Sequence, residues 1–342
     1  MVTRVGILGA RGYAALELIK ILLRHPAAEI TVLTSRLEEQ PQISEVHPQL
    51  AGRLDLGLEP FELDSVAGRV DVVFSCLPHA ASAEVVCKLV DAGVRVIDFS
   101  ADYRLDDIDI YQKWYEVEHP DPGRVGQVPY GLPELYREQI VGAELVANPG
   151  CYPTSAILPL APLLSAGLIS TSGIIVDSKS GVSGAGRTPK LGTLYPECNE
   201  SISAYGVGAH RHTPEINQLL SAAAGSGVEV IFTPHLVPMN RGILTTIYAP
   251  LAADTSEKEL MDALRGAYQQ EPFVQVVEHL PATSHVVGTN YCHLTARRVG
   301  DRAVLVSCLD NLVKGASGVA VQNFNLLMGL EETTALVDGA RA

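Results

Sequence analysis

The residue with the clearest chemical potential is a cysteine between a chain bend and a predicted helix start. Cys151 stands in NPGCYPTSA, where Asn-Pro-Gly ends an apolar strand and Pro153 falls near the first helical turn. Ligands bind at the carboxyl ends of strands in open α/β sheets, and free backbone N–H groups at a helix start favour a thiolate and a developing oxyanion. Core thiol, metal ligand and nucleophile are all open to Cys151, and this context favours the nucleophile.

A thiol nucleophile needs a base, and a pair of histidines offers one. GAHRHTPEI places His210 and His212 just before a predicted helix start at Thr213. In an extended segment, side chains two residues apart project to the same side, so both histidines can face one cleft while Arg211 faces away. We interpret the pair as a base or a substrate polariser. Core or surface histidines and metal ligands are the alternatives, but no third ligand stands at metal spacing nearby.

A glycine-rich turn near the start of the chain predicts a dinucleotide site. Gly6, Gly9 and Gly12 follow an apolar strand and open a helix in GILGARGYAALEL. Such a turn lets the backbone approach a pyrophosphate, which then sits at the helix N-terminus. The pattern alone also fits a tight strand-to-helix turn, but its position in the first strand–helix–strand unit favours a dinucleotide.

The end of the second strand indicates which dinucleotide binds. Sites for NAD usually place Asp or Glu there to hold the ribose 2′-hydroxyl. Here the strand ends in Thr34, Ser35 and Arg36, and the first carboxylate is that of Glu38. A hydroxyl and a guanidinium suit a 2′-phosphate, so we predict NADP(H). The alternative for Arg36 is a solvated loop arginine.

A second glycine-rich loop, DSKSGVSGAGR at 177–187, has small and hydroxylated residues that suit a backbone lying against a ligand. A flexible surface turn is the alternative. Arg187 ends this loop, and Arg104 follows another predicted strand in FSADYRL. Both are candidate cations for an anionic substrate, although a single arginine is more often a surface residue.

Composition limits the classes of function. The chain has 342 residues, 47% of them hydrophobic and 19% charged, which predicts a substantial core and about two domains. The net charge of −14 argues against nucleic acid as a partner. No apolar run is long enough to span a bilayer and no signal peptide is evident, so we expect a cytoplasmic protein without a membrane partner. The six cysteines form no C-x-x-C pair, which predicts reduced thiols, mostly in the core.

The order of predicted elements gives the fold class. Apolar strands at 4–9, 29–35, 70–78, 95–101 and 143–150 alternate with helices at 14–26 and 80–93, which is typical of a parallel sheet. Residues 102–142 are predicted to be irregular. After Cys151, alternating strands predict a mixed or antiparallel sheet with one solvated or interface face. Pro159 and Pro162 predict that the helix after Cys151 is short, kinked or broken. His279 and His285 are predicted to be loop residues.

Taken together, the motifs resemble those of the N-acetyl-γ-glutamyl-phosphate reductases of arginine biosynthesis. The matching stretches run in family order from Gly6 to Leu330, and they are GILGARGYAALEL, FSADYRL, VPYGLPEL, ANPGCYPTSAILPLAPL, DSKSGVSGAGR, GAHRHTPEI, PHLVPMNRGILTTIY and DNLVKGASGVAVQNFNLLMGL. The cysteine and His-Arg-His stretches are the most specific. One departure is Ala15, where the family usually has another glycine, and alanine serves at the last position of such turns.

The resemblance implies an α/β protein in two domains. A Rossmann-type NADP-binding domain with a mostly parallel sheet is expected at 1–149 plus 312–342. An α+β catalytic, substrate and oligomerisation domain is expected at 150–311, sharing its architecture with aspartate-semialdehyde dehydrogenases. Independently of the resemblance, the small residues of GASGVAVQNFNLLMG and the alternating strands after Cys151 indicate a homo-oligomer built through its sheets, either a dimer or a tetramer.

The resemblance also distributes roles among residues. It implies that Cys151 is the nucleophile and that His210 is the acid/base, with His212 as the other candidate. The residues expected to bind the cofactor are Gly9, Arg11, Gly12, Tyr13, Ser35, Arg36, Leu77, Pro78, Ser180, Gly181, Ser183, Gly184 and Asn323. Those expected to bind the substrate are Arg104, Asn148, Arg187 and His212. No metal ligand is expected.

The implied reaction is the NADPH-dependent reduction of an acyl phosphate to an aldehyde and inorganic phosphate through a thioester on Cys151. Two rivals keep this chemistry but change the substrate, to a carrier-linked α-aminoadipyl phosphate of lysine synthesis or to aspartyl phosphate. A rival of another class is a non-catalytic NADP(H)-sensing protein, which needs the glycine turn but not the cysteine and histidines.

Overall fold

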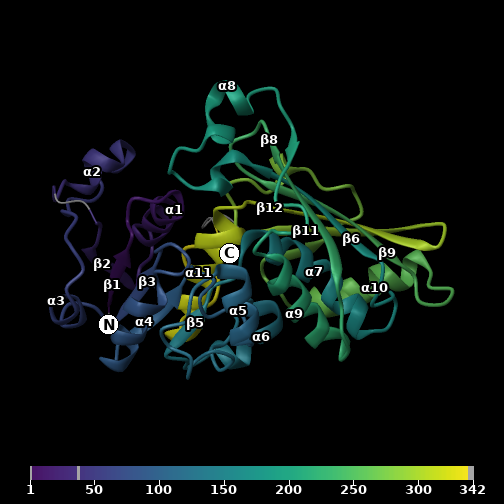
Figure 1. The fold of residues 1–342 in the computed structure, drawn as a ribbon, viewed down its shortest axis with the longest axis horizontal. Helices are drawn as coiled ribbons and strands as arrows, with labels where there is room; N and C mark the ends of the chain where they lie inside the picture. The colour runs from purple at the N-terminus through teal and green to yellow at the C-terminus, as the bar shows by residue number, and fades with distance from the viewer. Residues whose placement is uncertain (1, 37–38, 338–342) are drawn as a thin grey trace. The chain divides into compact units, whose positions relative to one another are not determined.

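The computed structural model describes residues 2–36 and 39–337, which divide into two compact units (Figure 1). The first unit comprises the described residues of Met1–Pro149 and of Ala316–Ala342, and the second is Gly150–Gly315. Within the described ranges, no helix combines the length and the apolar composition needed to cross a membrane.

The first unit is built on a five-stranded parallel sheet in the order β2-β1-β3-β4-β5. After β2 the chain crosses to the other side of β1, so the strand order reverses between β1 and β3. Ligands of doubly wound sheets bind at such a point, beyond the carboxyl ends of the strands. The strands are β1 (Thr3–Leu8), β2 (Ala28–Leu33), β3 (Val72–Ser75), β4 (Arg95–Asp98) and β5 (Leu145–Ala147).

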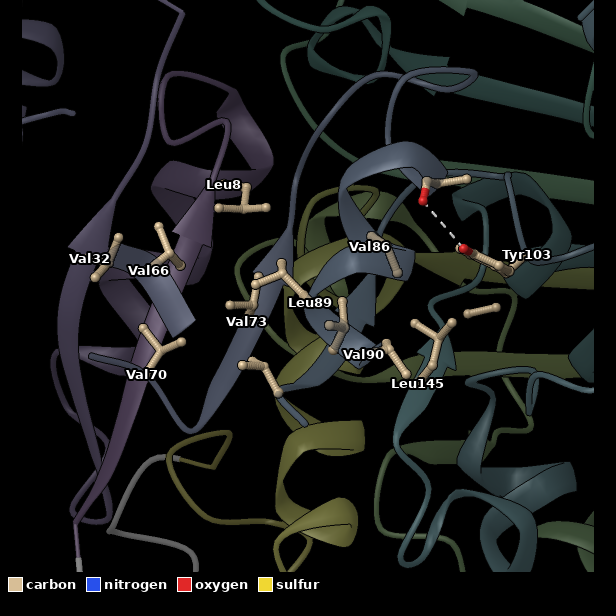
Figure 2. Close-up of a cluster of buried hydrophobic side chains, with 14 residues drawn as sticks. Leu8, Val32, Val66, Val70, Val73, Val86, Leu89, Val90, Tyr103 and Leu145 are labelled. Atoms are coloured by element: carbon tan, nitrogen blue, oxygen red, sulfur yellow. Dashed lines mark hydrogen bonds between the residues drawn. The ribbon is translucent and has the colours of Figure 1, made fainter. Parts of the chain in front are cut away.

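A cluster of buried aliphatic side chains joins one face of this sheet to two helices (Figure 2). Val73 of β3 and Leu145 of β5 supply the sheet side, while Val66 of α3 and Leu89 of α4 supply the helix side. Tyr103 closes one end of the cluster, and its hydroxyl donates to the carbonyl of Ala83 at 3.4 Å. The helices of the unit are α1 (Tyr13–Leu22), α2 (Ile43–Val46), η1 (Pro48–Leu50), α3 (Leu63–Ala67), α4 (Ala83–Asp91), α5 (Ile108–Tyr115), α6 (Pro133–Ile140) and α11 (Gly318–Leu327).

Helix α11 comes from the end of the chain and completes the core of the first unit. Every residue of α11 is buried. Its Phe324 packs against Phe74 of β3, with ring centroids 5.7 Å apart. Because neighbouring residues of a strand point to opposite faces, Phe74 lies on the face opposite to Val73. Helix α11 therefore covers the second face of the parallel sheet.

The second unit is built on a seven-stranded mixed sheet in the order β10-β11-β12-β9-β6-β8-β7. Strand pairs β6–β8 and β10–β11 are parallel, and the other pairs are antiparallel. The strands are β6 (Ile174–Gly181), β7 (Ser203–Ala204), β8 (Val230–Val237), β9 (Ile243–Pro250), β10 (Val274–Val276), β11 (Cys292–Val299) and β12 (Arg302–Leu309).

One face of this sheet is covered by three helices, α7 (Cys151–Ser165), α9 (Thr213–Ala224) and α10 (Glu257–Tyr268) (Figure 1). Residues of β6 and β9 alternate between buried and half-exposed, as expected when only one face is packed. The shorter helical turns of the unit are η2 (Val182–Ala185), η3 (Leu191–Thr193), α8 (Tyr195–Cys198), η4 (Thr283–His285) and η5 (Val313–Ser317), the last being a π-helical turn that continues into the first unit.

The helix after Cys151 was predicted to be short, kinked or broken, and it is neither short nor broken, because α7 runs for 15 residues with Pro159 and Pro162 inside it. A proline lacks the N–H that would bond to the carbonyl four residues earlier. For Pro162 that carbonyl belongs to Leu158, and it accepts instead from the hydroxyl of Tyr268 in α10 at 2.6 Å. A long-range partner thus replaces the missing bond.

We expect Tyr268→Phe to destabilise the second unit. The change removes the hydroxyl but keeps the ring, so the buried Leu158 carbonyl loses this donor, which costs about 1–3 kcal/mol of unfolding free energy. Chemical denaturation of the variant measures this loss. Tyr195→Phe is the matched control, because the Tyr195 side chain is 75% exposed and should change stability by less than about 0.5 kcal/mol. Equal stability of the two variants would contradict the role given to Tyr268.

Two other predicted segments also differ from the structure. Residues 102–142, predicted to be irregular, contain α5 and α6. Helix α5 begins at an Asp107 side chain that accepts from the N–H groups of Asp109 and Ile110, a capping signal that the surrounding prolines obscured. The stretch HVVGTNYCHLTARRV at 285–299, one of the alternating strands predicted after Cys151, forms a strand only from Cys292, because 285–291 forms turns.

Candidate active site

Cys151 is the first residue of α7, as the predicted helix start requires. The preceding Gly150 is extended, with φ −74° and ψ 150°, and its N–H donates to the Glu215 carboxylate at 2.9 Å. Glu215 is buried near the start of α9. The two helix starts are therefore joined directly beside the thiol. Backbone N–H groups at a helix N-terminus carry partial positive charge, which stabilises a thiolate.

Two tyrosines lie beside the cysteine. The hydroxyls of Tyr152 and Tyr205 are hydrogen-bonded at 2.9 Å. Desolvation, opposed by this hydrogen bond and reinforced by nearby Cys151, raises the pKa of Tyr205 to about 12. Desolvation also raises the pKa of Tyr152. Both hydroxyls therefore stay protonated at neutral pH and act as neutral hydrogen-bonding groups.

The two predicted histidines join the same aromatic cluster. The His210 ring lies 5.5 Å from Tyr152, 5.6 Å from Tyr205 and 4.9 Å from His212, between ring centroids. Burial, with a smaller contribution from the positive charge of Arg211, lowers the pKa of His210 to about 4. His210 is therefore neutral at pH 7. The two histidines thus join one aromatic cluster with Tyr152 and Tyr205, and Cys151 lies near enough to both tyrosines to raise their pKa.

A backbone contact selects the tautomer of His210. Its Nδ1 accepts from the backbone N–H of His212 at 3.1 Å. A neutral imidazole that accepts at one nitrogen carries its proton on the other, so the proton of His210 sits on Nε2. In this state the ring donates a hydrogen bond through Nε2 and offers no free lone pair there.

The other cysteines have different surroundings. Burial raises the pKa of Cys76, and burial with the neighbouring Cys292 raises that of Cys308 to about 12. Desolvation also raises the pKa of Cys87 in α4. These thiols are held in their protonated, unreactive form. Among the six cysteines, Cys151 alone is the first residue of a helix.

The second glycine-rich segment, predicted as a loop at 177–187, is strand β6 as far as Gly181 and becomes a loop only after it. This loop is fixed from several sides. Gly181 has no room for a side chain, since a Cβ there would lie 2.6 Å from the carbonyl oxygen of Asn240. The Ser183 hydroxyl donates to the same carbonyl at 2.7 Å and accepts from Asn311 at 3.0 Å. Next to the loop lies a cavity of about 340 Å³, large enough for a small ligand. Its lining residues include Val182, Tyr195 and Asn240.

The predicted residues of this loop differ in exposure. Ser180 and Ser183 are buried, whereas Gly184 and Arg187 are exposed. A rigid backbone with small side chains fits a ligand-contacting loop better than a flexible surface turn. Contacts of these residues with a cofactor or substrate stay predictions.

Sequence reasoning missed three groups around the site. Glu215 and Tyr205 lack a local signal, because each acts through a residue more than 50 positions away. Gly315, in the π-helical turn, lies against the nucleophile, and a Cβ there would come within 2.8 Å of the Cys151 Cβ. The small residues of GASG predict close packing, but not against which partner.

In the first unit, the glycine turn after β1 has the geometry of a phosphate-binding turn. Gly9 has φ +72°, and a Cβ there would lie 2.8 Å from the Cys76 carbonyl oxygen, so only glycine fits. Gly12 is extended and directly precedes α1. The turn therefore brings backbone to the N-terminus of α1 at the point where the strand order reverses. Both features fit a pyrophosphate.

The other predicted cofactor residues of this unit surround the same strand ends. Arg11 and Tyr13 are exposed on the turn and at the first position of α1. Leu77 and Pro78 directly follow Cys76, at the end of β3. Beyond β2, Ser35 is buried and Arg36 exposed, while Glu38 lies outside the described residues.

Asn323 of α11 adds a buried polar group to the first unit. Its Nδ2 donates to the Gly131 carbonyl at 2.9 Å and to Asn148 Oδ1 at 3.1 Å. Its Oδ1 is buried, and no partner for it occurs in residues 2–36 and 39–337. An orphaned buried acceptor is costly unless a ligand or water satisfies it. This oxygen fits the amide donor of a nicotinamide.

Arg104 is more embedded than a substrate-binding cation at a surface would be. It is 4% exposed, and its Nε and Nη2 donate to the carbonyls of Asn148 and Phe99 at 2.7 and 2.6 Å. These bonds fix the chain just before the NPG bend. Direct contact of Arg104 and Asn148 with the substrate stays a prediction.

Two family models match the chain. The semialdehyde dehydrogenase NAD binding domain matches residues 4–143, and the semialdehyde dehydrogenase dimerisation domain matches residues 151–311. The parallel sheet with its glycine turn lies in the first match, and Cys151 is the first residue of the second.

Solved structures share the fold. The chain superimposes on aspartate semialdehyde dehydrogenase II of Vibrio cholerae, complexed with ASA, with a TM-score of 0.72 and 18% identity, covering 96% of this chain and 99% of the other. Aspartate semialdehyde dehydrogenase of Candida albicans, solved with NADP, gives a TM-score of 0.70 at 17% identity, with coverage of 96% and 99%. At this identity the likeness establishes the fold, and it confirms the predicted α/β class.

Sequence relatives are much closer. An N-acetyl-γ-glutamyl-phosphate reductase of Rhodopirellula baltica is 57% identical over 98% of both chains. Another of Geobacter sp. is 50% identical over 97% of both chains. The resemblance inferred from the motifs is confirmed. An NAD(P)-type nucleotide-binding unit and a unit that begins at a cysteine on a helix start are joined in one chain, which belongs to the N-acetyl-γ-glutamyl-phosphate reductase family.

Proposed function

We propose that the protein reduces N-acetyl-L-glutamyl 5-phosphate to N-acetyl-L-glutamate 5-semialdehyde and inorganic phosphate, with NADPH as reductant. The observation that carries this proposal is the position of Cys151 at the start of α7, near two neutral tyrosines whose rings pack with His210. A nucleotide-sensing protein has no need of such a cluster. The identity of the substrate is taken from the names of the relatives in this family.

The covalent step takes place on Cys151. Its thiolate attacks the acyl carbon and expels inorganic phosphate, which leaves a thioester. When bound, NADPH supplies the hydride that reduces this thioester. The resulting tetrahedral alkoxide then collapses and expels sulfur, which releases the aldehyde and restores the Cys151 thiolate. Sulfur thus returns to its starting state and no metal takes part.

The charge that develops on the acyl oxygen needs hydrogen-bond donors. The backbone N–H groups of Cys151 and Tyr152, in the first turn of α7, are suited to this role, since Pro153 has none to offer. The Nε2–H of His210 supplies a third donor in the tautomer fixed by His212. In the state described here, His210 therefore fits a substrate polariser better than a base. A base role requires the ring to leave its bond with the His212 N–H.

The first unit holds the cofactor. Gly9 and Gly12 allow the pyrophosphate to approach the N-terminus of α1, and Asn323 Oδ1 receives the nicotinamide amide. Ser35 and Arg36 bind the 2′-phosphate. The remaining predicted contacts, Arg11, Tyr13, Leu77 and Pro78 in this unit and Ser180, Gly181, Ser183 and Gly184 in the other, line the cofactor. Arg104, Asn148, Arg187 and His212 orient the substrate.

Arg36→Ala should reduce the preference for NADP(H) over NAD(H) about 10- to 100-fold, because one charge-assisted bond to the 2′-phosphate is worth about 1.5–3 kcal/mol. The measurement is the ratio of kcat/KM for the two cofactors. Arg53→Ala removes another exposed arginine of the same unit and should leave the ratio unchanged. An unchanged ratio in Arg36→Ala would refute the assignment of the 2′-phosphate to Arg36.

The substrate is tested by comparing aldehydes in the phosphate-dependent reduction of NADP⁺. N-acetylglutamate semialdehyde should give the highest kcat/KM, followed at a distance by aspartate semialdehyde and the aminoadipate-derived aldehyde. A preference for either of the last two would keep the mechanism and overturn the substrate. No turnover with any of the three, together with intact NADPH binding, would support the sensing protein instead.

We also propose a cytoplasmic homo-oligomer, either a dimer or a tetramer, built through the open face of the seven-stranded sheet. Ile231 and Tyr248 of this face are 60% and 39% exposed, and the family model that matches this unit is described as a dimerisation domain. The six free cysteines are usual for a reducing compartment. Light scattering measures the mass of the assembly, and a monomer would contradict this arrangement.

A further inference from the structure

Three histidines outside the proposed active site meet at the β10 edge of the seven-stranded sheet. His279 follows β10, His285 ends η4, and His293 is the second residue of β11. One ring nitrogen from each lies within 4.8 Å of the others. The ring centroids are 5.3 Å apart for His279 and His285, and 6.1 and 6.3 Å from each of these to His293.

This spacing is close to that of a metal centre. A tetrahedral zinc ion with Zn–N bonds of about 2.0–2.1 Å holds its ligand nitrogens about 3.4 Å apart. Closing the three nitrogens onto one ion therefore takes a shift of roughly 1 Å at each side chain. His279 and His285 are exposed and able to rotate, whereas His293 is half-buried in a strand. Two adjustable ligands and one fixed ligand are present.

One ring nitrogen of His293, Nδ1, is buried without a hydrogen bond among the described residues. An imidazole with an unsatisfied nitrogen beside two further imidazoles is an arrangement that a cation with affinity for nitrogen ligands completes.

His285 must exchange one contact to take part. Its Nδ1 accepts from the Ala282 N–H at 3.2 Å, which leaves the ring proton on Nε2. Binding of an ion through Nε2 moves this proton to Nδ1 and releases the Ala282 N–H. Because His285 is exposed, water can satisfy that N–H instead.

We propose that His279, His285 and His293 form a binding site for a divalent transition-metal ion, with Zn²⁺ as the ion of choice. Three neutral imidazoles and a water molecule would complete a tetrahedral shell. No residue of this site belongs to the proposed reaction. The ion would fasten the 277–291 connection to β11.

The connection that carries two of these ligands also supports other parts of the second unit. The N–H of Gly288 donates to the Asp310 carboxylate at 2.7 Å, and Asp310 pairs with Arg241 at 3.1 Å. A Cβ on Gly242 would lie 2.9 Å from the side chain of Thr283, so the connection packs closely on that glycine. Metal binding would therefore make the 277–291 connection more rigid, and this connection contacts Gly242 and the Asp310 carboxylate that pairs with Arg241.

The test is a titration of tag-free, chelator-treated enzyme with Zn²⁺ by calorimetry and with Co²⁺ by visible spectroscopy. We expect one ion per chain, a tetrahedral Co²⁺ spectrum and a higher Tm with Zn²⁺. His279→Gln, His285→Gln and His293→Gln should each weaken binding at least about 10-fold. The first two residues are exposed, so circular dichroism should show that their variants remain folded.

Controls separate this site from other histidines and thiols. His79→Gln removes an exposed histidine of the other unit and should bind Zn²⁺ like the wild type. Cys151→Ala should also retain the ion. Binding lost in Cys151→Ala but kept in His293→Gln would place the ion at the active site and overturn the proposal. An affinity no tighter than millimolar in the wild type would overturn it as well.

Discussion

Cys151→Ala is expected to reduce kcat/KM by at least about 10⁴-fold while leaving the dissociation constant for NADPH within about twofold of the wild-type value. Loss of a covalent nucleophile removes the reaction path, and residual binding and hydrogen bonding recover little of it. The cofactor-binding residues of the first unit do not include this side chain. The variant should therefore bind NADPH normally while it loses turnover.

Single-turnover chemistry gives the sharper readout. Without phosphate, N-acetylglutamate semialdehyde and NADP⁺ should carry the wild-type enzyme only to the thioester. That reaction yields one equivalent of NADPH per active site and a protein whose mass has risen by one acyl group. Cys151→Ala should show neither the burst nor the adduct. Cys87→Ala, which removes a thiol of α4, is the matched control and should show both. A full burst in Cys151→Ala would rule out the covalent mechanism.

Replacement of His210 is expected to have the second largest effect. His210→Ala removes the Nε2–H donor and should lower kcat/KM about 10²- to 10³-fold, the usual effect of losing one donor to a developing oxyanion. His210→Gln places an amide N–H near the same point but cannot titrate. If the tautomer fixed by the His212 N–H is the working one, His210→Gln should recover to within about 10-fold of the wild type.

The pH profile distinguishes a donor from a base. The pKa of His210, lowered to about 4 by burial, puts its titration well below that of an exposed imidazole at 6.5. The wild-type profile of kcat/KM should therefore show no acid limb from His210 between pH 5 and 7. Two results together would show that His210 is a base and that our assignment is wrong. The first is an acid limb near pH 6–7 in the wild-type profile that is absent from the profile of His210→Gln. The second is an equally low kcat/KM for His210→Ala and His210→Gln. His212→Gln, run in parallel, shows whether the second histidine titrates instead.

The same shift has a consequence for stability. Between pH 6.5 and about 4 the unfolded chain binds a proton at His210 that the folded protein does not. Protonation thus favours the unfolded state, and this residue makes the enzyme less stable as the pH falls through that range. Above pH 6.5 both states are neutral at His210 and the effect disappears.

The parts of the site that could be predicted are those determined by local sequence. Gly9 must be glycine because of its own φ angle, and Cys151 begins a helix because of the glycine before it and the proline two residues after it. Alternating and continuous apolar runs likewise predicted both sheets, because side-chain direction has period two along a strand.

The parts that could not be predicted depend on partners far away in the chain. Nothing near Pro162 reveals that Tyr268 replaces its missing hydrogen bond, so the length of α7 was underestimated. From the sequence, Arg104 was predicted to be a cation available to a substrate or solvent. The structure instead shows it buried and hydrogen-bonded to the Asn148 carbonyl. Similarly, His279 and His293 are ordinary isolated histidines in the sequence, and the pairing of β10 with β11 brings them to one edge.

Helix α11 imposes an order of events on synthesis. Its ten buried residues complete the first unit, yet they leave the ribosome only after the whole of Gly150–Gly315 has been made. At typical translation rates that interval is on the order of ten seconds, far longer than a small domain needs to collapse. During this time the sheet face that carries Phe74 is not yet covered by α11. The nascent first unit therefore exposes apolar surface and is prone to aggregation until the last helix docks.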